Sequence, residues 1–158
     1  MTTFPLLASG CYYNQDHELL RPKVKSESTF NQQLPIENYN TPLAIGTKQI
    51  LIEIADTDNS REQGLSNRDV LSDENGMLFK FQNTNTPNPS FWMKDMKFNL
   101  DMIWINNQKI IGITPNIPAP ENNLNLPTYS PPSNITDVLE VAAGFTERNN
   151  IKIGDTVK

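Results

Sequence analysis

The stretch SFWMKDMKFNLDMIWI, residues Ser90–Ile105, decides the fold of this chain. Its first four residues predict a short strand, KDMKF predicts a polar connection, and NLDMIWI predicts a strand that is apolar on both faces. A strand with two apolar faces is covered on both sides, so we expect it to be central in a sheet. Asp101 stands inside this strand, and a buried carboxylate without a partner costs several kcal/mol. We therefore expect Asp101 either on an exposed face or beside a basic or hydrogen-bonding partner.

Further strands are predicted on both sides of this stretch. They are marked by alternating or β-branched apolar residues between turn signals, at 48–57, 75–81, 108–114, 135–145 and 151–158. A short helix is predicted in TDNSREQGLSNR, with Thr57 or Ser60 as N-cap and Gly64 at its end. TERNN predicts a turn or a second short helix, and Asn106 and Asn107 are expected to take the positive φ of a tight hairpin turn.

These elements predict a mainly β fold, a small β-barrel or sandwich with one or two short helices. We expect residues 48–158 to form a single β-rich domain. Residues 12–47 carry isolated apolar side chains at no steady period, which is typical of a flexible linker, so a disordered N-terminal tether is expected to precede the domain. The proline-rich segment 115–134 is a long excursion of a kind that is usually functional or mobile.

The first eleven residues are similar to the end of a bacterial lipoprotein signal. Ala8, Ser9 and Gly10 stand directly before Cys11, as small residues do in a lipobox, where the cysteine thiol is acylated. The stretch departs from that pattern because Ala8 replaces the usual leucine and no Lys or Arg precedes it, so we interpret residues 1–11 as a truncated signal whose true start lies upstream. The alternative is an N-terminus in which Cys11 has no role.

Composition excludes several function classes. The net charge is −5, the pI is near 4.8 and the 13 basic residues are scattered, so no nucleic acid partner is expected. The chain has one histidine, His17, and one cysteine, Cys11, too few for a zinc, iron–sulfur or haem site. We expect no cofactor and no metal, although a purely oxygen-ligated calcium or magnesium ion stays open. No apolar run approaches the roughly 20 residues that span a bilayer, so membrane attachment is expected only through a lipid on Cys11.

Several phrases, taken together, resemble one known family. These are REQGLSNRDVL, NGMLFKF, FWMKDMKFNLDMIWI, KIIGI, DVLEVAAG and IKIGDTV. In this order they resemble the bacterial and archaeal domain of unknown function, family 192, over Gln49–Val157. The resemblance implies a small β-rich fold, often in secreted or lipid-anchored proteins, and no established reaction. It places recurrent polar positions on Arg61, Arg68, Lys94, Asp101 and Glu140, and recurrent structural positions on Gly64, Gly76, Trp92 and Gly144.

This chain departs from the family pattern at three places. Ser66 stands where the family usually has methionine, Asp95-Met96 replaces its usual Asn-Thr, and Asn99 replaces its usual proline. The turn before Asp101 is therefore expected to differ in detail.

The candidate site follows from these charged residues. Asp101 and Glu140 each stand inside an apolar strand, whereas Arg61, Arg68 and Lys94 stand at element ends, from which long side chains reach inward. We hypothesise that the five charges meet in one network. This network either fixes strand register or lines a cleft that receives a polar ligand. Two carboxylates across roughly 5 to 10 Å would also suit hydrolysis of a glycosidic bond.

Trp92 is a second kind of candidate. It follows a loop rich in asparagine and threonine, and an indole at such a junction can stack on a sugar ring. Trp104 stands between isoleucines and is expected in the core. A methionine-rich copper(I) site is the weakest interpretation, because no Met-x-x-Met repeat or nearby histidine is present.

Three functional hypotheses stay open for an extracytoplasmic, lipid-anchored domain of the cell envelope. A noncatalytic module that binds a small polar ligand, a glycan or a protein partner predicts that Trp92, Lys94, Arg68 and the segment 115–134 border one concavity. A hydrolase of envelope glycan or peptide predicts Asp101 and Glu140 face to face, with at least one raised pKa. A purely structural lipoprotein predicts neither.

Overall fold

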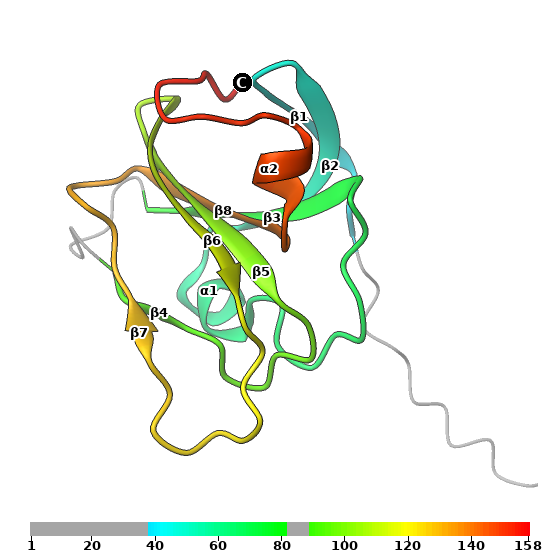
Figure 1. Cartoon of the computed structure of the whole chain (residues 1–158), viewed down its shortest axis with the longest axis vertical. Helices are drawn as coiled ribbons and strands as arrows, with labels where there is room; N and C mark the ends of the chain where they lie inside the picture. The colour runs from blue at the N-terminus through cyan, green and yellow to red at the C-terminus, as the bar shows by residue number, and fades with distance from the viewer. Residues whose placement is uncertain (1–37, 82–88) are drawn as a thin grey trace, which may run out of the picture. The chain divides into compact units, whose positions relative to one another are not determined.

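Six strands form one mixed sheet in this computed structural model, which describes residues 38–81 and 89–158 (Figure 1). The strands are β1 (Thr41–Ile45), β2 (Lys48–Ala55), β3 (Asn75–Lys80), β5 (Leu100–Asn106), β6 (Lys109–Ile117) and β8 (Asp137–Ala142). Their order in the sheet is β1-β2-β3-β8-β5-β6. The β2–β3 pair is parallel and the other neighbours are antiparallel. This architecture confirms the predicted mainly β fold.

Two short helices and a small second sheet complete the described fold. The helices are α1 (Asp58–Gln63) and α2 (Phe145–Arg148), and the second sheet pairs β4 (Phe91–Trp92) with β7 (Thr128–Tyr129). The predicted helix over TDNSREQGLSNR is confirmed, with Thr57 as its N-cap and Gly64 as its C-cap. The predicted short strand in SFWM is also confirmed as β4.

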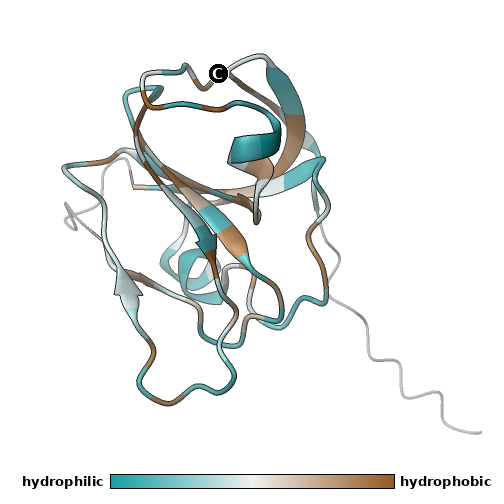
Figure 2. Cartoon of the chain, viewed as in Figure 1, coloured by the Kyte–Doolittle hydropathy of each residue, from teal (hydrophilic) through white to brown (hydrophobic). Residues whose placement is uncertain are grey.

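The sheet carries an apolar cluster on each face. One cluster contains Ile103 and Leu139 of the sheet together with Phe145 of α2. The other contains Met102 and Trp104 of the sheet together with residues of the segments after α1 and β4. Figure 2 shows the apolar residues concentrated along the strands, whereas α1 is largely hydrophilic. The strand β5 is buried along both faces, as its sequence predicts, and lies between β8 and β6.

The first strand was assigned incorrectly from the sequence. β1 lies within residues 12–47, which the sequence analysis assigned to a flexible linker. Its five residues are too few to show a period, and they are ordered by antiparallel pairing with β2 across a turn in which Gly46 has a φ of 56°. The rest of the predicted linker up to residue 37, together with His17, Cys11 and the lipobox-like stretch, lies outside the described residues.

The C-terminal segment also differs from its prediction. Residues 151–158 do not form a full strand, and only Thr156 and Val157 make isolated bridges, to Lys109 and Ile45. The segment thus hydrogen-bonds to both edge strands, through Ala44 of β1 and Ile110 of β6. The two edges of the sheet are joined there instead of gaining a seventh strand.

One predicted turn and one predicted loop differ in detail from the structure. The hairpin between β5 and β6 places positive φ at Asn107 and Gln108, one residue later than predicted, because Asn106 still pairs with Lys109. The segment 115–134 is not a plain loop, since it contains β7.

Candidate functional site

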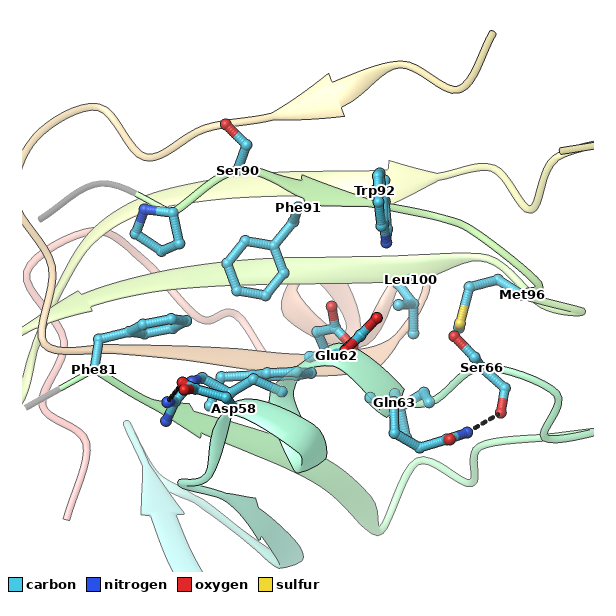
Figure 3. A pocket seen from close by; sticks show the side chains of 16 residues that line it. Asp58, Glu62, Gln63, Ser66, Phe81, Ser90, Phe91, Trp92, Met96 and Leu100 are labelled. Carbon is cyan, nitrogen blue, oxygen red and sulfur yellow. Dashed lines mark hydrogen bonds and ion pairs between the residues drawn. The ribbon is translucent and has the colours of Figure 1, made fainter. Parts of the chain in front are cut away.

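A pocket of about 290 Å³ opens between α1, the end of β3, β4 and the middle of β8 (Figure 3). We call it the α1 pocket. Its walls carry the aromatic side chains of Phe79, Phe81, Phe91 and Trp92, its rim on α1 carries Asp58, Arg61, Glu62 and Gln63, and Glu140 lines it from β8. Figure 3 shows Phe91 and Trp92 pointing from β4 toward α1, with Glu62 opposite them. The strands of the two sheets therefore supply apolar walls, and the helix supplies a polar rim.

The polar rim is held in place by the ends of α1. Thr57 and Ser60 form a capping box, in which each side chain accepts a hydrogen bond from the backbone of the other residue. The helix ends at Gly64, whose φ is 49°, and a Cβ built there would lie 3.3 Å from Cζ of Phe79. The chain after α1 therefore lies directly on an aromatic side chain of the wall.

The aromatic walls are fixed by edge-to-face packing. The Phe91 ring centroid lies 5.3 Å from that of Phe79, 5.9 Å from that of Phe81 and 5.6 Å from that of Trp104, with interplanar angles of 84°, 76° and 77°. Each of these arrangements is the edge-to-face geometry that aromatic quadrupoles favour. The three phenylalanines of the wall are therefore held by packing against one another and against Trp104.

Glu140 is the unusual group of the α1 pocket. Its residue is only 4% exposed, and its register neighbours in β3 and β5 are the buried residues Met77 and Met102. Its carboxyl group makes no hydrogen bond or ion pair with any residue that the structure describes, and its oxygens are not fully enclosed, because the one fully enclosed side-chain atom without a partner in this part of the chain is Asp137 Oδ1. Burial raises the pKa of Glu140 from 4.5 to about 8, so the carboxyl group keeps its proton at neutral pH. A protonated carboxyl can both donate and accept a hydrogen bond.

A second, more polar hollow adjoins the α1 pocket. It has a volume of about 340 Å³, shares Trp92 and Glu62 with the α1 pocket, and is also lined by Lys94 and Asp95. The Lys94 Nζ lies 5.9 Å from the centroid of the Trp92 ring, a cation–π arrangement, and Trp92 is 54% exposed. Trp92 is thus accessible from both hollows.

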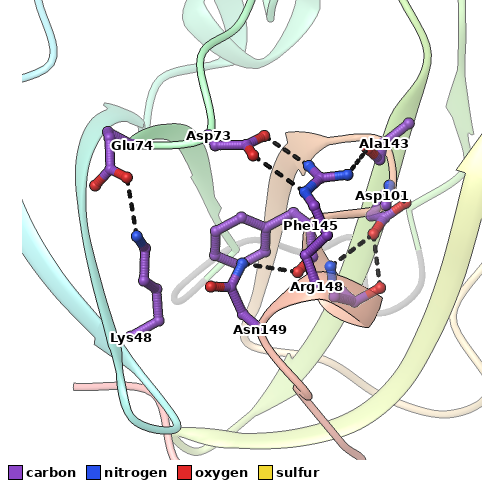
Figure 4. A network of polar contacts seen from close by, with 10 residues as sticks. Lys48, Asp73, Glu74, Asp101, Ala143, Phe145, Arg148 and Asn149 are labelled. Atoms are coloured by element: carbon purple, nitrogen blue, oxygen red, sulfur yellow. Dashed lines mark hydrogen bonds and ion pairs between the residues drawn. The ribbon is translucent and has the colours of Figure 1, made fainter.

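Asp101 has a different environment from Glu140. Its carboxylate accepts four hydrogen bonds: Asn116 N (2.8 Å) and Gly144 N (2.9 Å) donate to Oδ1, and Thr146 N (2.9 Å) and Thr146 Oγ1 (2.6 Å) donate to Oδ2. Figure 4 shows Asp101 beside α2. Because these donors lie at the start of α2 and on β6, the carboxylate ties the helix to the sheet. Of the two environments expected for Asp101 from the sequence, the structure therefore shows the one with hydrogen-bonding partners.

The predicted network of five charges is not formed. Asp101 is in register with Val141, and Glu140 with Met102, so the two carboxyl groups point to opposite faces of the sheet. The interpretation in which they face each other across a cleft is wrong for this reason. A strand has a side-chain period of two, so the faces of two residues on different strands depend on register, which the sequence alone does not show.

The two arginines make separate contacts. Arg61 lines the α1 pocket, donates to Asp58 Oδ1 (2.5 Å) and to the carbonyl of Lys80 (2.9 Å), and lies over the Phe81 ring. Arg68 does not line either hollow; it donates to Glu53 and to the Tyr39 hydroxyl, both at 2.8 Å.

The pKa of Arg68 reflects this setting. Burial lowers it, but the hydrogen bond and charge of Glu53, together with Tyr39, outweigh burial and leave it raised.

The predicted concavity is only partly as expected. Trp92 and Lys94 border one hollow together, as predicted, but neither Arg68 nor segment 115–134 contributes to the described lining. Glu62 and the phenylalanines of the wall were not predicted as site residues from the sequence. Of these residues only Phe91 had a signal in the sequence, because it stands next to Trp92 in SFWM. Phe79 and Phe81 reach the pocket through the pairing of strands that are distant in sequence.

Two further findings concern the described residues only. Within 38–81 and 89–158, no group of three or more His, Cys, Asp or Glu side chains is arranged to hold a metal ion. In the same part of the chain, no helix is both long and apolar enough to cross a membrane.

The comparisons with known proteins identify relatives without assigning an activity. The family DUF192, described as "Uncharacterized ACR", matches residues 41–158. A crystal structure of a candidate transcription regulator from Sinorhizobium meliloti 1021 is similar at 28% identity with a TM-score of 0.65, covering 74% of this chain and 91% of that one. A protein of unknown function from Novosphingobium aromaticivorans DSM 12444 is similar at 27% identity with a TM-score of 0.64, covering 74% and 83%. No curated protein matches.

Proposed function

The chain belongs to DUF192, the domain of unknown function family 192, and we propose that its β-rich domain binds a small ligand in the α1 pocket. In this proposal a polar group of the ligand lies against the Glu140 carboxyl, and an apolar part of the ligand lies between the aromatic walls. The role is noncatalytic.

The observation that carries the proposal is the buried carboxyl group of Glu140. A buried polar group without a hydrogen-bond partner costs roughly 1 to 3 kcal/mol, so native proteins pair nearly all of them. Glu140 has no partner among the described residues, and its carboxyl oxygens are not fully enclosed, so they are open to the pocket. A ligand in the pocket would pair with this carboxyl, which an apolar side chain at the same position would not offer.

The size and walls of the α1 pocket favour a small ring-containing ligand. Its volume of about 290 Å³ is close to the lower end of the range for small-molecule pockets, roughly 300 Å³. Flat aromatic side chains offer stacking surfaces to an aromatic ring or to the apolar face of a sugar. The exposed Trp92 lies at the opening, where the polar hollow begins.

Binding is favoured over hydrolysis by the arrangement of the carboxyl groups. The predicted acid–base pair required Asp101 and Glu140 on the same side of one bond, and they lie on opposite faces of the sheet. Asp101 is also occupied by four hydrogen bonds. The net charge of −5 opposes binding to phosphates, so we propose no nucleic acid partner.

The cellular location is a separate proposal. We propose that the domain works in the cell envelope, anchored through a lipid on Cys11, on the strength of the lipobox-like residues before it. Mass spectrometry of the membrane fraction of the native host tests this. A lipid-modified Cys11 supports the proposal, and an unmodified thiol ends it.

Ligand binding is tested with two ring-sized probes, benzamide and benzamidine, added at millimolar concentration to the isotope-labelled full chain. We expect at least one probe to cause saturable amide shifts at Gly64, Leu65 and Phe91. Trp92→Ala should weaken that binding, whereas Leu124→Ala, which removes another exposed apolar side chain, should not. Absence of saturable shifts with both probes, or equal effects of the two variants, would contradict the proposal.

A further inference from the structure

We infer that the ligand of the α1 pocket is an organic cation, such as a protonated amine or amidine on an apolar ring-sized body, with its charge against Glu140. This inference rests on the proposed function and specifies its ligand class.

The first support is the balance of charge around the pocket. Four charged residues line it: Asp58, Arg61, Glu62 and Glu140. Arg61 and Asp58 pair with each other, and Arg61 also donates to the carbonyl of Lys80. Glu62 and Glu140 make no hydrogen bond or ion pair with any described residue, so the side chains left for a ligand are both carboxyl groups. Because Arg61 is already paired with Asp58, an anionic ligand would gain no free cation there and would meet the carboxylate of Glu62.

The second support is the chemistry of the elements that face Glu140. The described lining from β3, β4 and β5 is uncharged, with Phe79, Phe91, Trp92 and Leu100. Aromatic faces attract cations through their quadrupoles, and the attraction grows when water is excluded. The protein already uses such contacts at this place, since the Arg61 guanidinium lies 5.5 Å from the Phe81 ring centroid and Lys94 lies over Trp92. Lys94 lines the adjoining hollow and not the α1 pocket.

The third support is the burial of Glu140, which strengthens an ion pair between its carboxylate and a bound cation. The residue is only 4% exposed, so an ion pair formed with its carboxyl inside the pocket is screened less than a surface pair. Without a ligand, burial favours the neutral acid, and a bound cation favours the carboxylate. Binding of a cation should therefore release the Glu140 proton at neutral pH.

Because cation binding releases the Glu140 proton, the affinity for a cation should increase with pH. The free carboxyl has a pKa of about 8, so at lower pH a cation must first displace its proton, and above that pH the carboxylate is already present. Affinity for a permanently charged cation should rise as the pH is raised from about 6 to about 9. A neutral ligand of the same shape should show no such rise.

The test compares benzamidine, a cation over this pH range, with benzamide, its neutral counterpart, on the full chain. We expect benzamidine to bind at least about tenfold more tightly at high pH. Its affinity should rise with pH in the natural chain and in Glu147→Gln, which alters an exposed carboxylate on α2. The rise should be absent in Glu140→Gln, which imitates the protonated acid. Calorimetry in two buffers of different ionisation enthalpy should show proton release only when Glu140 is present.

The outcomes separate the two proposals. Equal binding of both probes, or tighter binding of benzamide, would overturn the cation inference and leave a ligand pocket. A pH profile that is unchanged in Glu140→Gln would also overturn it. Failure of both probes to bind would overturn the pocket proposal together with the inference.

Discussion

At the scale of the residue, Asp101 and Glu140 differ in environment although they lie one register step apart in neighbouring strands. The carboxylate of Asp101 accepts four hydrogen bonds from Asn116, Gly144 and Thr146, whereas the carboxyl of Glu140 has no partner among the described residues. A buried acid with its hydrogen bonds satisfied stabilises the structure around it. A buried acid without partners costs stability, which is typical of a group kept for function.

Replacement of Asp101 by asparagine should destabilise the fold. An amide offers one acceptor oxygen in place of two, and its NH2 group would face the donors of Thr146. We expect a loss of about 3 kcal/mol in the free energy of unfolding. Urea denaturation measures it, with the exposed Asp56→Asn as a control expected to change little. Equal stability of the two variants would mean that Asp101 does not hold α2 to the sheet.

Replacement of Glu140 by glutamine should stabilise the fold, in contrast to Asp101→Asn, and the gain in unfolding free energy should depend on pH. The unfolded chain ionises this carboxyl near its ordinary pKa of 4.5, but the folded chain keeps the proton up to about 8. Raising the pH through this window therefore removes stability from the natural chain. Relative to Glu140→Gln, the natural chain should lose on the order of 4 kcal/mol between acidic and alkaline pH.

Chemical denaturation of both chains at several pH values measures this effect. The two chains should be similarly stable below the ordinary carboxyl pKa, and Glu140→Gln should be the more stable above the raised one. A constant difference across the pH range would show that the Glu140 carboxyl is not shifted.

The sequence identified both acids and could not assign their roles. Each stands out as a carboxylate inside an apolar strand, in NLDMIWI and in DVLEVAA. Their roles depend on which face each one takes, and that depends on the pairing of Asp101 with Val141 and of Met102 with Glu140. Register of this kind comes from long-range packing. The donors at Gly144 and Thr146 are equally remote in sequence.

At the scale of the element, α1 positions the rim of the pocket through its N-terminal cap. Thr57→Ala removes the side-chain acceptor that Ser60 N uses, and it should cost about 1 kcal/mol of stability. The α1 residues that line the pocket should also become more mobile. Urea denaturation with amide hydrogen exchange measures both effects. Thr47→Ala, in the turn between β1 and β2, is the control; equal effects of the two changes would show that the cap is not important for α1.

Prediction of elements succeeded where a pattern was long and local. β2 and β3 carry runs of apolar residues beside turn signals in their own sequence, and the capping residues of α1 lie within one short segment. β1 and β7 were missed because five and two residues show no period, and each is ordered by a partner strand. The α1 pocket was missed for the same reason, since its walls come from strands that meet only in the folded chain.

At the scale of the whole molecule, the C-terminal segment joins the two edges of the sheet. Val157 is 5% exposed, bridges to Ile45 and belongs to the apolar cluster that includes Phe145 of α2. Val157→Ala should lower the free energy of unfolding by about 2 kcal/mol. Ile153→Ala, in the same segment but 67% exposed, should change it little. Thermal or urea denaturation compares them, and an equal effect would contradict the bridging role.

Membership of the family and the mainly β architecture were both predictable, because they depend on phrases that run through the domain. The match over residues 41–158 extends that domain to include β1. The ligand pocket was not predictable in this way. It depends on the spatial meeting of α1, β4 and the middle of β8, three elements separated in sequence by loops.

The most direct test of the central claim is a carbon-13 NMR titration of the Glu140 side-chain carboxyl, in the full chain, with and without benzamidine. We expect a midpoint of about 8 in the free protein, and a clearly lower midpoint when the cation is bound. A midpoint near the ordinary value of 4.5 that does not respond to benzamidine would contradict it. Glu140 would then be neither shielded from water nor in contact with the ligand.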